Sequence, residues 1–531
     1  MHLLRQLRYL KSLLLPSPLE TFLYQHFSGK KSKPETKSVS VILIQCVEDP
    51  YYFILWATII NLLKRETRFS VHQLIPRGCN LGESSSVKHW VYTKLTRNKI
   101  FDQKWVHLYA AVCDKIAYRN MAFLDAFLHP FEFVAAWKKW GQLRSLEDVL
   151  TLNFDGIEVG DLIYDTYLRY KPSPTVKLQD LYLLLIIWRS IRFIRKANTY
   201  FKDVKPAFFF TSYTTYIQHG VPVRIALAYG VPVYSFGNLF ELYKKITIQD
   251  LFHSKNTANY ASIFSQLEDL PQKLADAEQA LKKRFSGEID LSTSYMRQSA
   301  YKTVEQNIPD LTGYTVIFLH DFFDSPHIYG WLLFPDFWIW ICFTIDTLRA
   351  QEIPFAIKPH PNQAPEAKDA LDTLKLRFPD VTFLSPNYTN VQLVNAGMVQ
   401  AVTVYGTIAH EMAYFGISTI ACGLNPHQSY TFCKTATSLE SYRQLLVSAR
   451  LSAVDKNQMR LEALSFYFMH NLYDDISNRI VLRSTLIKLK KCLEEKCNNP
   501  ETTQEKLWQI MNELELLIKM DDKLKPFEEL L

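Results

Sequence analysis

The sequence predicts an α/β protein with two Rossmann-like domains and extra helices at both ends of the chain. Short apolar runs alternate with stretches of helical periodicity in two separate regions, which is the pattern of parallel strands joined by helices. Polar residues follow several of these runs directly, at the strand ends where open α/β sheets bind ligands. The length of 531 residues, 48% of them hydrophobic, is sufficient for two cores and appendages.

The first domain is expected over residues 38–250. Its early part shows the order strand, helix, strand, which is typical of a parallel α/β unit. A mainly helical layer should follow the second strand, and a long amphipathic helix should lead to the later strands. In chain order we expect a strand at 38–45, a helix at 51–63, a strand at 69–75, helices within 87–150, a helix at 178–200, and strands at 207–211 and 231–236.

The second domain is expected over residues 313–437, after a polar, lysine-rich helical connector at 251–312. Residues 438–531 are expected to be helical, and part of them should return to brace the first domain. Within the second domain we expect strands at 314–319, 355–357, 401–404 and 418–422, with helices at 364–378 and 408–415.

Two consecutive strand ends of this second domain carry candidate phosphate-binding residues. Lys358 and His360 lie in the turn after one strand, and Gly406 and Thr407 lie between the next strand and its helix. A glycine and a hydroxyl at a helix N-terminus let a phosphate approach free backbone N–H groups. Glu411 lies one helical turn beyond Thr407, where a carboxylate would accept hydrogen bonds from a ribose diol. The alternative is an ordinary turn histidine and a plain helix cap.

The segments KPHP (358–361) and VYGTIAHEMAYFGISTIACG (404–423) resemble the donor half of a GT-B glycosyltransferase. The resemblance is to the bacterial capsule and lipopolysaccharide biosynthesis group, which includes Kdo transferases and, more distantly, sialyltransferases. It extends over residues 150–240 and 313–430, and it departs at Gly416-Ile417-Ser418, where proline is common. It implies a central cleft and a sugar moved from a nucleotide donor to a growing surface glycan, with a CMP-linked acidic sugar favoured.

The same resemblance implies roles for the donor residues. Lys358 and His360 would neutralise the donor phosphate, Thr407 and the neighbouring amides would bind it, and Glu411 would hold the ribose. Cations and helix amides would then support the leaving phosphate, so neither a divalent metal nor a cofactor is expected.

The loop after the first strand of the second domain reads HDFFDSPH. Asp321, Asp324 and His327 are predicted to contact the donor sugar or shape its pocket. The alternative is that Asp-Ser-Pro serves only as turn chemistry.

Residues 153–170, NFDGIEVGDLIYDTYLRY, concentrate four carboxylates and resemble a segment of the same transferase group. Glycosyl transfer needs a base or a nucleophilic carboxylate. Asp161 is the first candidate and Asp165 the second, on one face of a helix. The alternative is an acidic helix start that suits the helix dipole.

The segment after the strand at 207–211 supplies candidate acceptor-binding residues. Tyr216, His219 and Arg224 are predicted to bind the acceptor sugar or a phosphate, and aromatic packing with a capping histidine is the alternative.

The net charge of +7 is concentrated near the N-terminus, where residues 1–37 hold seven basic and two acidic residues. A leucine-rich helix there predicts a peripheral contact with an anionic membrane surface, on the inner face of a bacterial inner membrane. A helix docked on its own protein is the alternative. No apolar run has the length of a bilayer span, no signal peptide is expected, and the eight scattered cysteines favour a reducing cytoplasm.

Three rival function classes remain from the sequence. A polyol-phosphate transferase of the teichoic-acid type and a sugar-nucleotide epimerase would share parts of the motif. A glycan-binding scaffold without catalysis would share the fold. No nucleic-acid partner is expected.

Overall fold

A computed structural model describes the chain over several ranges: residues 15–28, 40–76, 105–119, 129–171, 173–290, 299, 301, 305–361, 367–448, 455–473, 477–494, 500–520, 522 and 524–529. It confirms the α/β fold class with two parallel sheets. The chain divides into two compact units. The first comprises residues 1–170, 178–253 and 475–531, and the second comprises 171–177 and 254–474. The predicted central cleft stays a prediction.

The first unit holds a six-stranded sheet in the order β3-β2-β1-β6-β7-β8, parallel except for β8. Its edge strand β3 (Lys115–Arg119) lies where the sequence predicted mainly helix, because its charged ends hide the apolar pattern of a strand. The other strands are β1 (Ser40–Gln45), β2 (Phe69–Ile75), β6 (Phe208–Thr211), β7 (Val233–Phe236) and β8 (Tyr243–Ile246).

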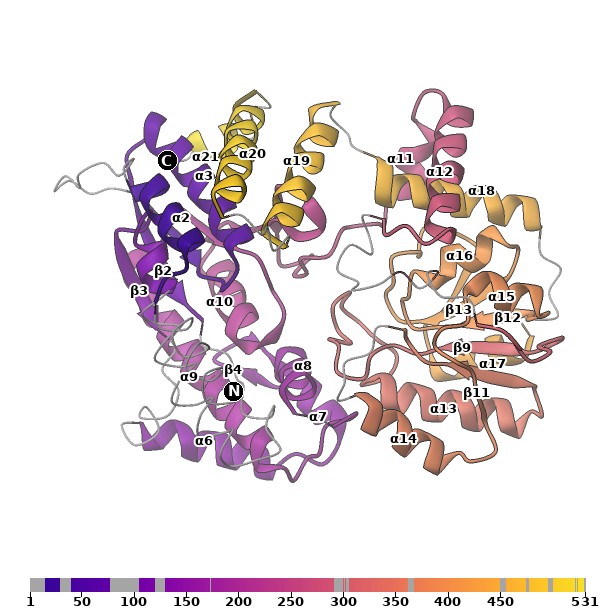
Figure 1. The fold of residues 1–531 in the computed structure, drawn as a ribbon. Helices are drawn as coiled ribbons and strands as arrows, with labels where there is room; N and C mark the ends of the chain where they lie inside the picture. The colour runs from indigo at the N-terminus through magenta and orange to yellow at the C-terminus, as the bar shows by residue number, and fades with distance from the viewer. Residues whose placement is uncertain are drawn as a thin grey trace, which may run out of the picture. The chain divides into compact units, whose positions relative to one another are not determined.

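Helices cover both faces of this sheet (Figure 1). On one face α3 packs with α2 and the C-terminal helices in a single apolar core. On the other face α9 and α10 lie together, with Phe201 of α9 against Phe209 of β6. The helices are α2 (Pro18–Ser28), α3 (Pro50–Glu66), α6 (Pro130–Gly141), α7 (Leu146–Leu150), α8 (Gly160–Tyr170), α9 (Leu181–Val204), α10 (Tyr216–Ala228), α19 (Ser477–Glu494), α20 (Pro500–Met520) and α21 (Lys525–Glu528); a short hairpin joins β4 (Asn153–Phe154) to β5 (Ile157–Glu158).

The N-terminal helix that the structure describes is docked on the protein. Leu23 and Phe27 of α2 are buried in the same core as α3. For residues 18–28 this fits the alternative of a helix docked on its own protein. The basic residues behind the membrane prediction lie outside the described ranges.

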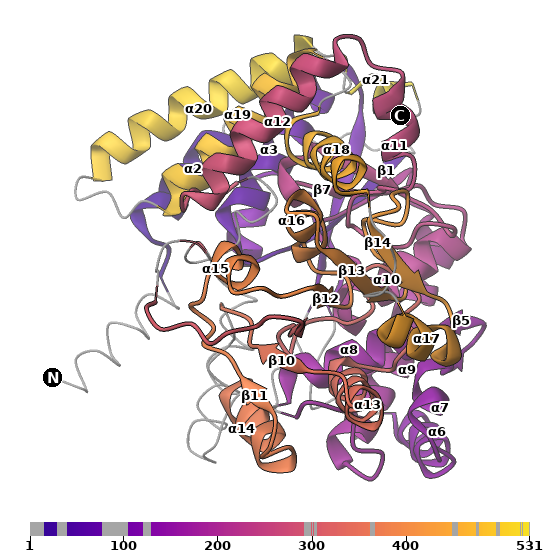
Figure 2. The ribbon, with the colours of Figure 1, turned by 90° about the vertical axis from the view of Figure 1, so that its right-hand side faces the viewer.

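The second unit holds a fully parallel sheet in the order β11-β10-β9-β12-β13-β14. Figure 2 shows its strands between helices, with α13, α14 and α17 packed on one face and α15 and α16 on the other. The strands are β9 (Thr315–Phe318), β10 (Phe355–Lys358), β11 (Thr382–Phe383), β12 (Gln400–Val402), β13 (Ser418–Cys422) and β14 (Cys433–Ala436).

Most predicted elements of the second unit occur within a few residues of their predicted bounds. The helices are α11 (Tyr260–Ser265), α12 (Leu270–Phe285), α13 (Phe337–Ala350), α14 (Ala367–Arg377), α15 (Asn390–Asn395), α16 (Ile408–Tyr414), α17 (Leu439–Ser448) and α18 (Lys456–Tyr467). Helices α11, α12 and α18 enclose a further apolar cluster beside α16. The predicted connector is thus part of the second unit.

No helix among the described residues has the length and hydropathy of a membrane span. The six cysteines within the described ranges are buried free thiols, and such thiols pack as small core residues.

Candidate functional site

The candidate site of the second unit lies at the carboxyl ends of its three central strands, β9, β10 and β12. Lys358 is the last residue of β10 and pairs in register with Phe318, the last residue of β9. His320 follows β9 after one residue, and Thr403 follows β12 directly. Because parallel strands end at one edge, these side chains converge there.

Lys358 is the most unusual group at this edge. Its side chain is 4% exposed, and its ammonium donates a hydrogen bond to the Pro386 carbonyl at 3.2 Å. Burial lowers the pKa of Lys358 from 10.5 to about 8, against a smaller opposite effect of Glu411. Among the described residues it forms no ion pair within 4.0 Å. A buried cation without a paired carboxylate is a ready partner for an anion.

Two half-buried histidines lie at this edge, His360 near Lys358 and His320 near His360. Burial lowers the pKa of His360 to about 4, with a further contribution from Lys358 that Asp321 partly offsets. Burial and the neighbouring His360 lower the pKa of His320 to about 3. Both imidazoles are therefore neutral near pH 7 and act as hydrogen-bonding groups.

His320 and Thr403 were not predicted as site residues, although the structure brings them together. The Nε2 atom of His320 lies 3.1 Å from the Thr403 hydroxyl, and its ring stacks on Phe337 at 4.8 Å. The available signal was position, because His320 comes directly after a predicted strand. Thr403 fell inside the predicted strand at 401–404 and was therefore assigned to the sheet.

Gly406 is required by its close neighbours. A Cβ atom there would lie 2.9 Å from the Thr403 hydroxyl and 3.7 Å from His320 Cε1. Thr407 follows as the N-cap residue of α16, and its side chain makes no capping hydrogen bond. Gly406 and Thr407 are both partly exposed, and Gly406 lies close to His320; their predicted donor contacts stay predictions.

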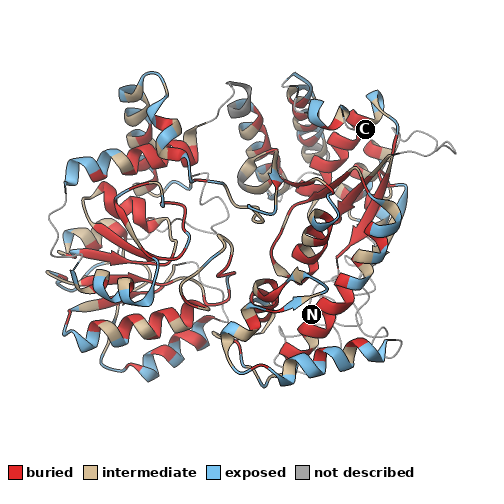
Figure 3. Cartoon of the chain, turned by 180° about the vertical axis from the view of Figure 1, so that it is seen from behind, coloured by how far each residue is buried: buried red, intermediate tan, exposed pale blue. Residues whose placement is uncertain are grey.

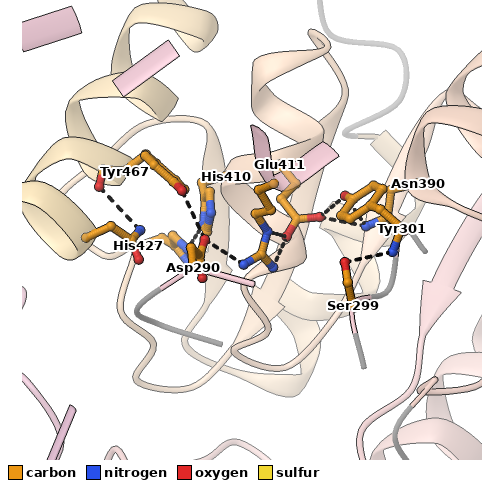
Figure 4. A network of polar contacts seen from close by, with 10 residues as sticks. Asp290, Ser299, Tyr301, Asn390, His410, Glu411, His427 and Tyr467 are labelled. Atoms are coloured by element: carbon orange, nitrogen blue, oxygen red, sulfur yellow. Dashed lines mark hydrogen bonds and ion pairs between the residues drawn. The ribbon is translucent and has the colours of Figure 1, made fainter. Parts of the chain in front are cut away.

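Glu411 has a different environment from the one its predicted ribose contact requires. It is 2% exposed, and one of its carboxylate oxygens accepts from Arg284 Nε at 2.9 Å and Nη2 at 2.5 Å. The other accepts from the Tyr301 hydroxyl and from Asn390 Nδ2, the latter at 2.6 Å (Figure 4). Both oxygens are thus occupied within the protein, so we assign Glu411 a structural role.

The network around Glu411 extends to α12 and α18. Arg284 also pairs with Asp290 at 2.7 Å, and Asp290 accepts from the Tyr467 hydroxyl at 3.1 Å. Burial opposes the charge of Arg284, but Glu411 and Asp290 hold its pKa above the ordinary value. This buried network fixes α12 and the Tyr301 side chain against α16.

The loop after β9 is built mainly as a turn. Asp321 Oδ1 accepts from the Phe323 N–H at 3.0 Å, and Asp324 Oδ1 accepts from the Ser325 N–H at 2.9 Å. Asp324 is exposed and His327 is 7% exposed. Asp321 lies close enough to His360 to affect its pKa. The predicted donor contacts of Asp321, Asp324 and His327 stay predictions.

In the first unit, the predicted catalytic Asp161 and the predicted acceptor ligand Arg224 bind each other. The guanidinium donates to both carboxylate oxygens, at 2.7 and 2.5 Å, and also to the Glu158 carbonyl at 2.6 Å. This pair joins α8 to α10. Asp165 points into the unit and is 2% exposed. The predicted catalytic roles of Asp161 and Asp165 stay predictions.

His219, a predicted acceptor-binding residue, lies in a hydrogen-bonded group at the end of β1. Gln45, the last residue of β1, donates through Nε2 to the Gln218 carbonyl at 3.1 Å, so its Oε1 atom faces His219 Nδ1 at 3.0 Å and the Thr211 hydroxyl at 2.6 Å. An amide oxygen only accepts, so Nδ1 of His219 carries the proton and Nε2 presents a lone pair. Burial and the neighbouring His253 lower the pKa of His219 to about 3.

Tyr216, the third predicted acceptor residue, begins α10 with a left-handed backbone, φ +61°. Its ring lies against Tyr170 at 5.9 Å. A non-glycine residue in this region is strained, and such strain is concentrated at functional sites.

Among the described residues no three His, Cys, Asp or Glu side chains are grouped as a metal site.

No family model matches the chain, and no curated protein matches it. Among solved structures it is similar to the UDP-GlcNAc 2-epimerase of Methanocaldococcus jannaschii in complex with UDP-GlcNAc and UDP, with 8% identity over 80% of this chain and 97% of that chain and a TM-score of 0.23. It is also similar to the UDP-GlcNAc 2-epimerase from Neisseria meningitidis bound to UDP-GlcNAc, with 12% identity over 84% of this chain and 99% of that chain and a TM-score of 0.23. A UDP-glucosyltransferase from Polygonum tinctorium is similar with 11% identity over 91% of this chain and 100% of that chain and a TM-score of 0.19. Likenesses of this size say nothing about activity, so we base the function on the chain's own residues.

Proposed function

We propose that the chain is a nucleotide-sugar-dependent glycosyltransferase whose second unit binds the phosphate of the donor. The observation that carries this proposal is Lys358, a buried ammonium at the end of a central strand that is paired with no carboxylate among the described residues. A buried ammonium lowers the stability of the fold when no anion is bound to it, and it gains a partner when an anion binds. His360 and the backbone at Gly406 and Thr407 complete the anion site.

The charge at this edge supports a donor with a single phosphate. His320 and His360 are neutral near pH 7, since their pKa values are lowered to about 3 and about 4. Lys358 is then the cation among the described side chains at these three strand ends. One positive charge matches a phosphodiester such as that of a CMP-sugar better than a diphosphate. This agrees with the single phosphate of the CMP linkage that the sequence resemblance implies.

The first unit supplies the acceptor side of the proposal. His219 stays neutral and accepts a hydrogen bond from a sugar hydroxyl through Nε2, while Gln45 fixes its tautomer. Tyr216 adds an aromatic face of the kind on which sugar rings pack. The finer assignment, to a capsule or lipopolysaccharide acceptor at the inner face of a bacterial inner membrane, rests on the sequence resemblance alone.

A thermal-shift series of the full chain tests the donor site. CMP, CDP, UDP, GDP and ADP are each added, without and then with magnesium, because a ligand that binds the folded state raises the melting temperature. We expect the largest shift with CMP and its loss in Lys358→Met. Lys368→Met, which removes an exposed lysine of α14, is the matched control and should retain the shift.

The catalytic part of the proposal is tested with CMP-sugars as donors. Release of CMP that depends on an added glycan acceptor supports glycosyl transfer. Release of CMP from a CDP-polyol instead would indicate the polyol-phosphate transferase class. If the chain binds none of these nucleotides, the proposal is refuted and a glycan-binding scaffold is favoured.

A further inference from the structure

A surface on the first unit is independent of the proposed donor and acceptor residues. Helix α6 is anchored on one side and open on the other. Ala136 is fully buried, and the buried carboxylate of Glu132 pairs with Arg192 at 2.7 Å and Arg195 at 3.1 Å. These contacts fasten the helix to α9 and determine which face remains outside.

Much of α6 is exposed, as the pale blue of this helix in Figure 3 shows, and its exposed residues include large apolar ones. Phe131, Val134 and Trp137 follow each other at intervals of three residues and so lie along one stripe. They are 84%, 55% and 53% exposed, and Phe131 has the largest exposed fraction among the exposed large hydrophobic residues of the described ranges. Single exposed apolar residues are ordinary, but a contiguous stripe on one helix indicates an interaction surface.

The stripe is held in place by neighbouring rings. The ring of Trp137 lies 6.2 Å from that of Phe133 and 5.7 Å from that of Trp140, and Phe133 in turn contacts Trp188 of α9 at 6.1 Å. The exposed indole therefore loses little conformational freedom when it is covered by a partner.

The charges around this stripe are positive. Lys138 and Lys139 are exposed in the last turn of α6, and Arg144 is exposed just after it. Glu132, the one acidic residue between 129 and 144, is buried in its pair with arginine. The nearest acids along the chain are in α7, where Asp148 caps the helix and Glu147 is exposed.

Exposed aromatic side chains and exposed lysines on the same helix match the boundary of an anionic bilayer. Aromatic rings partition into the headgroup region, and each lysine near the surface is attracted to anionic lipid. A second copy of the chain is a poorer partner, because a two-fold contact through α6 would bring the same lysines together. We propose that the exposed face of α6 is a membrane-contact surface that inserts Phe131 and Trp137 into anionic lipid.

Vesicle flotation of the full chain tests this surface. One vesicle is pure phosphatidylcholine and the other contains a third of phosphatidylglycerol. The wild-type chain should float with the anionic vesicle and much less with the neutral one. Phe131→Ser combined with Trp137→Ser should lower the partition by about tenfold or more, since two aromatic side chains no longer leave water. Lys138→Glu combined with Lys139→Glu should remove the preference for anionic lipid.

Trp508→Ser is the matched control, because Trp508 of α20 is 50% exposed, close to the value for Trp137. It should float like the wild type, and all variants should melt at the wild-type temperature. The proposal is overturned if the wild type does not float with anionic vesicles, or if the α6 variant floats equally well. It is also overturned if Trp137→Ser only converts a dimer to a monomer in gel filtration and leaves flotation unchanged.

Discussion

Replacement of Lys358 by methionine separates function from stability in this protein. The variant keeps a long side chain in the buried position and removes the charge. A pKa lowered from 10.5 to about 8 means that the charged form is disfavoured in the fold by ~3 kcal/mol at neutral pH, since each pKa unit is worth ~1.4 kcal/mol. The lost hydrogen bond to the Pro386 carbonyl offsets ~1 kcal/mol of this. We expect the free energy of unfolding of Lys358→Met to equal that of the wild type or to exceed it by up to ~2 kcal/mol.

The effect should depend on pH with a defined sign. The folded-state pKa of Lys358 lies below the unfolded one, so the unfolded chain binds more protons between about pH 8 and 10.5. The free energy of unfolding of the wild type should therefore rise with pH across this window relative to the methionine variant. Above pH 10.5 the contribution of the lysine charge to this difference disappears.

The assay is urea unfolding at several pH values, combined with nucleotide titration. Lys358→Met should weaken CMP binding by about tenfold to a hundredfold, which corresponds to a lost charge-assisted hydrogen bond. Lys368→Met should change neither quantity. A methionine variant that is destabilised by more than ~2 kcal/mol and still binds CMP as the wild type does would refute the reasoning, and Lys358 would then be a structural residue.

Three further predictions concern the same unit. Arg284→Met should lower the free energy of unfolding by ~3–5 kcal/mol, because it leaves the buried Glu411 carboxylate without its cation; urea unfolding measures this. Gly406→Ala should cost ~1–3 kcal/mol through the clash with Thr403 and should weaken CMP binding in a titration. Stability should fall as the pH drops below about 6.5, because burial lowers the folded-state pKa of His427 to about 3 and the unfolded chain then binds more protons; melting temperatures from pH 7 to pH 4 report it.

Each of these predictions has a control. Combining Arg284→Met with Glu411→Leu should recover part of the loss, and a loss equal to the sum of the two single changes would show that the pair is not coupled. Gly141→Ala, where a Cβ meets nothing within 4 Å, should leave stability and binding unchanged. If His427→Gln loses stability with falling pH as much as the wild type does, the pH dependence of stability arises from other buried histidines.

The sequence was most informative for buried strands rich in apolar residues. Strand β13 has its predicted bounds, Ser418–Cys422, because a strand that is buried on both faces is mostly apolar. Strand β2 also has its predicted bounds, although Ser70, His72 and Gln73 lie among its apolar residues. Strand β3 was missed because an edge strand with lysine and arginine at its ends lacks that run.

The candidate site was predictable only as far as it is local. Lys358 ends β10, His360 follows it by two residues, and Gly406 and Thr407 lie between β12 and α16, so topology alone places them at one edge. The role of Glu411 was not predictable, since its partner Arg284 lies 127 residues away in the chain. The same holds for Asp161, whose partner Arg224 is 63 residues distant. Pairing over such separations depends on tertiary packing, which no local pattern encodes.

The division of the first unit into separate stretches of chain determines the order in which the protein is finished during translation. Leu514 of α20 and Phe527 of α21 belong to the core built on α3, yet residues 254–474 of the other unit are synthesised before them. On the ribosome the second unit is therefore complete before α20 and α21 have been synthesised and can bury the apolar surface of α3. A nonsense mutation that removes α20 and α21 would leave the second unit complete and the apolar core on α3 of the first unit exposed. Aggregation of the truncated product is the expected consequence.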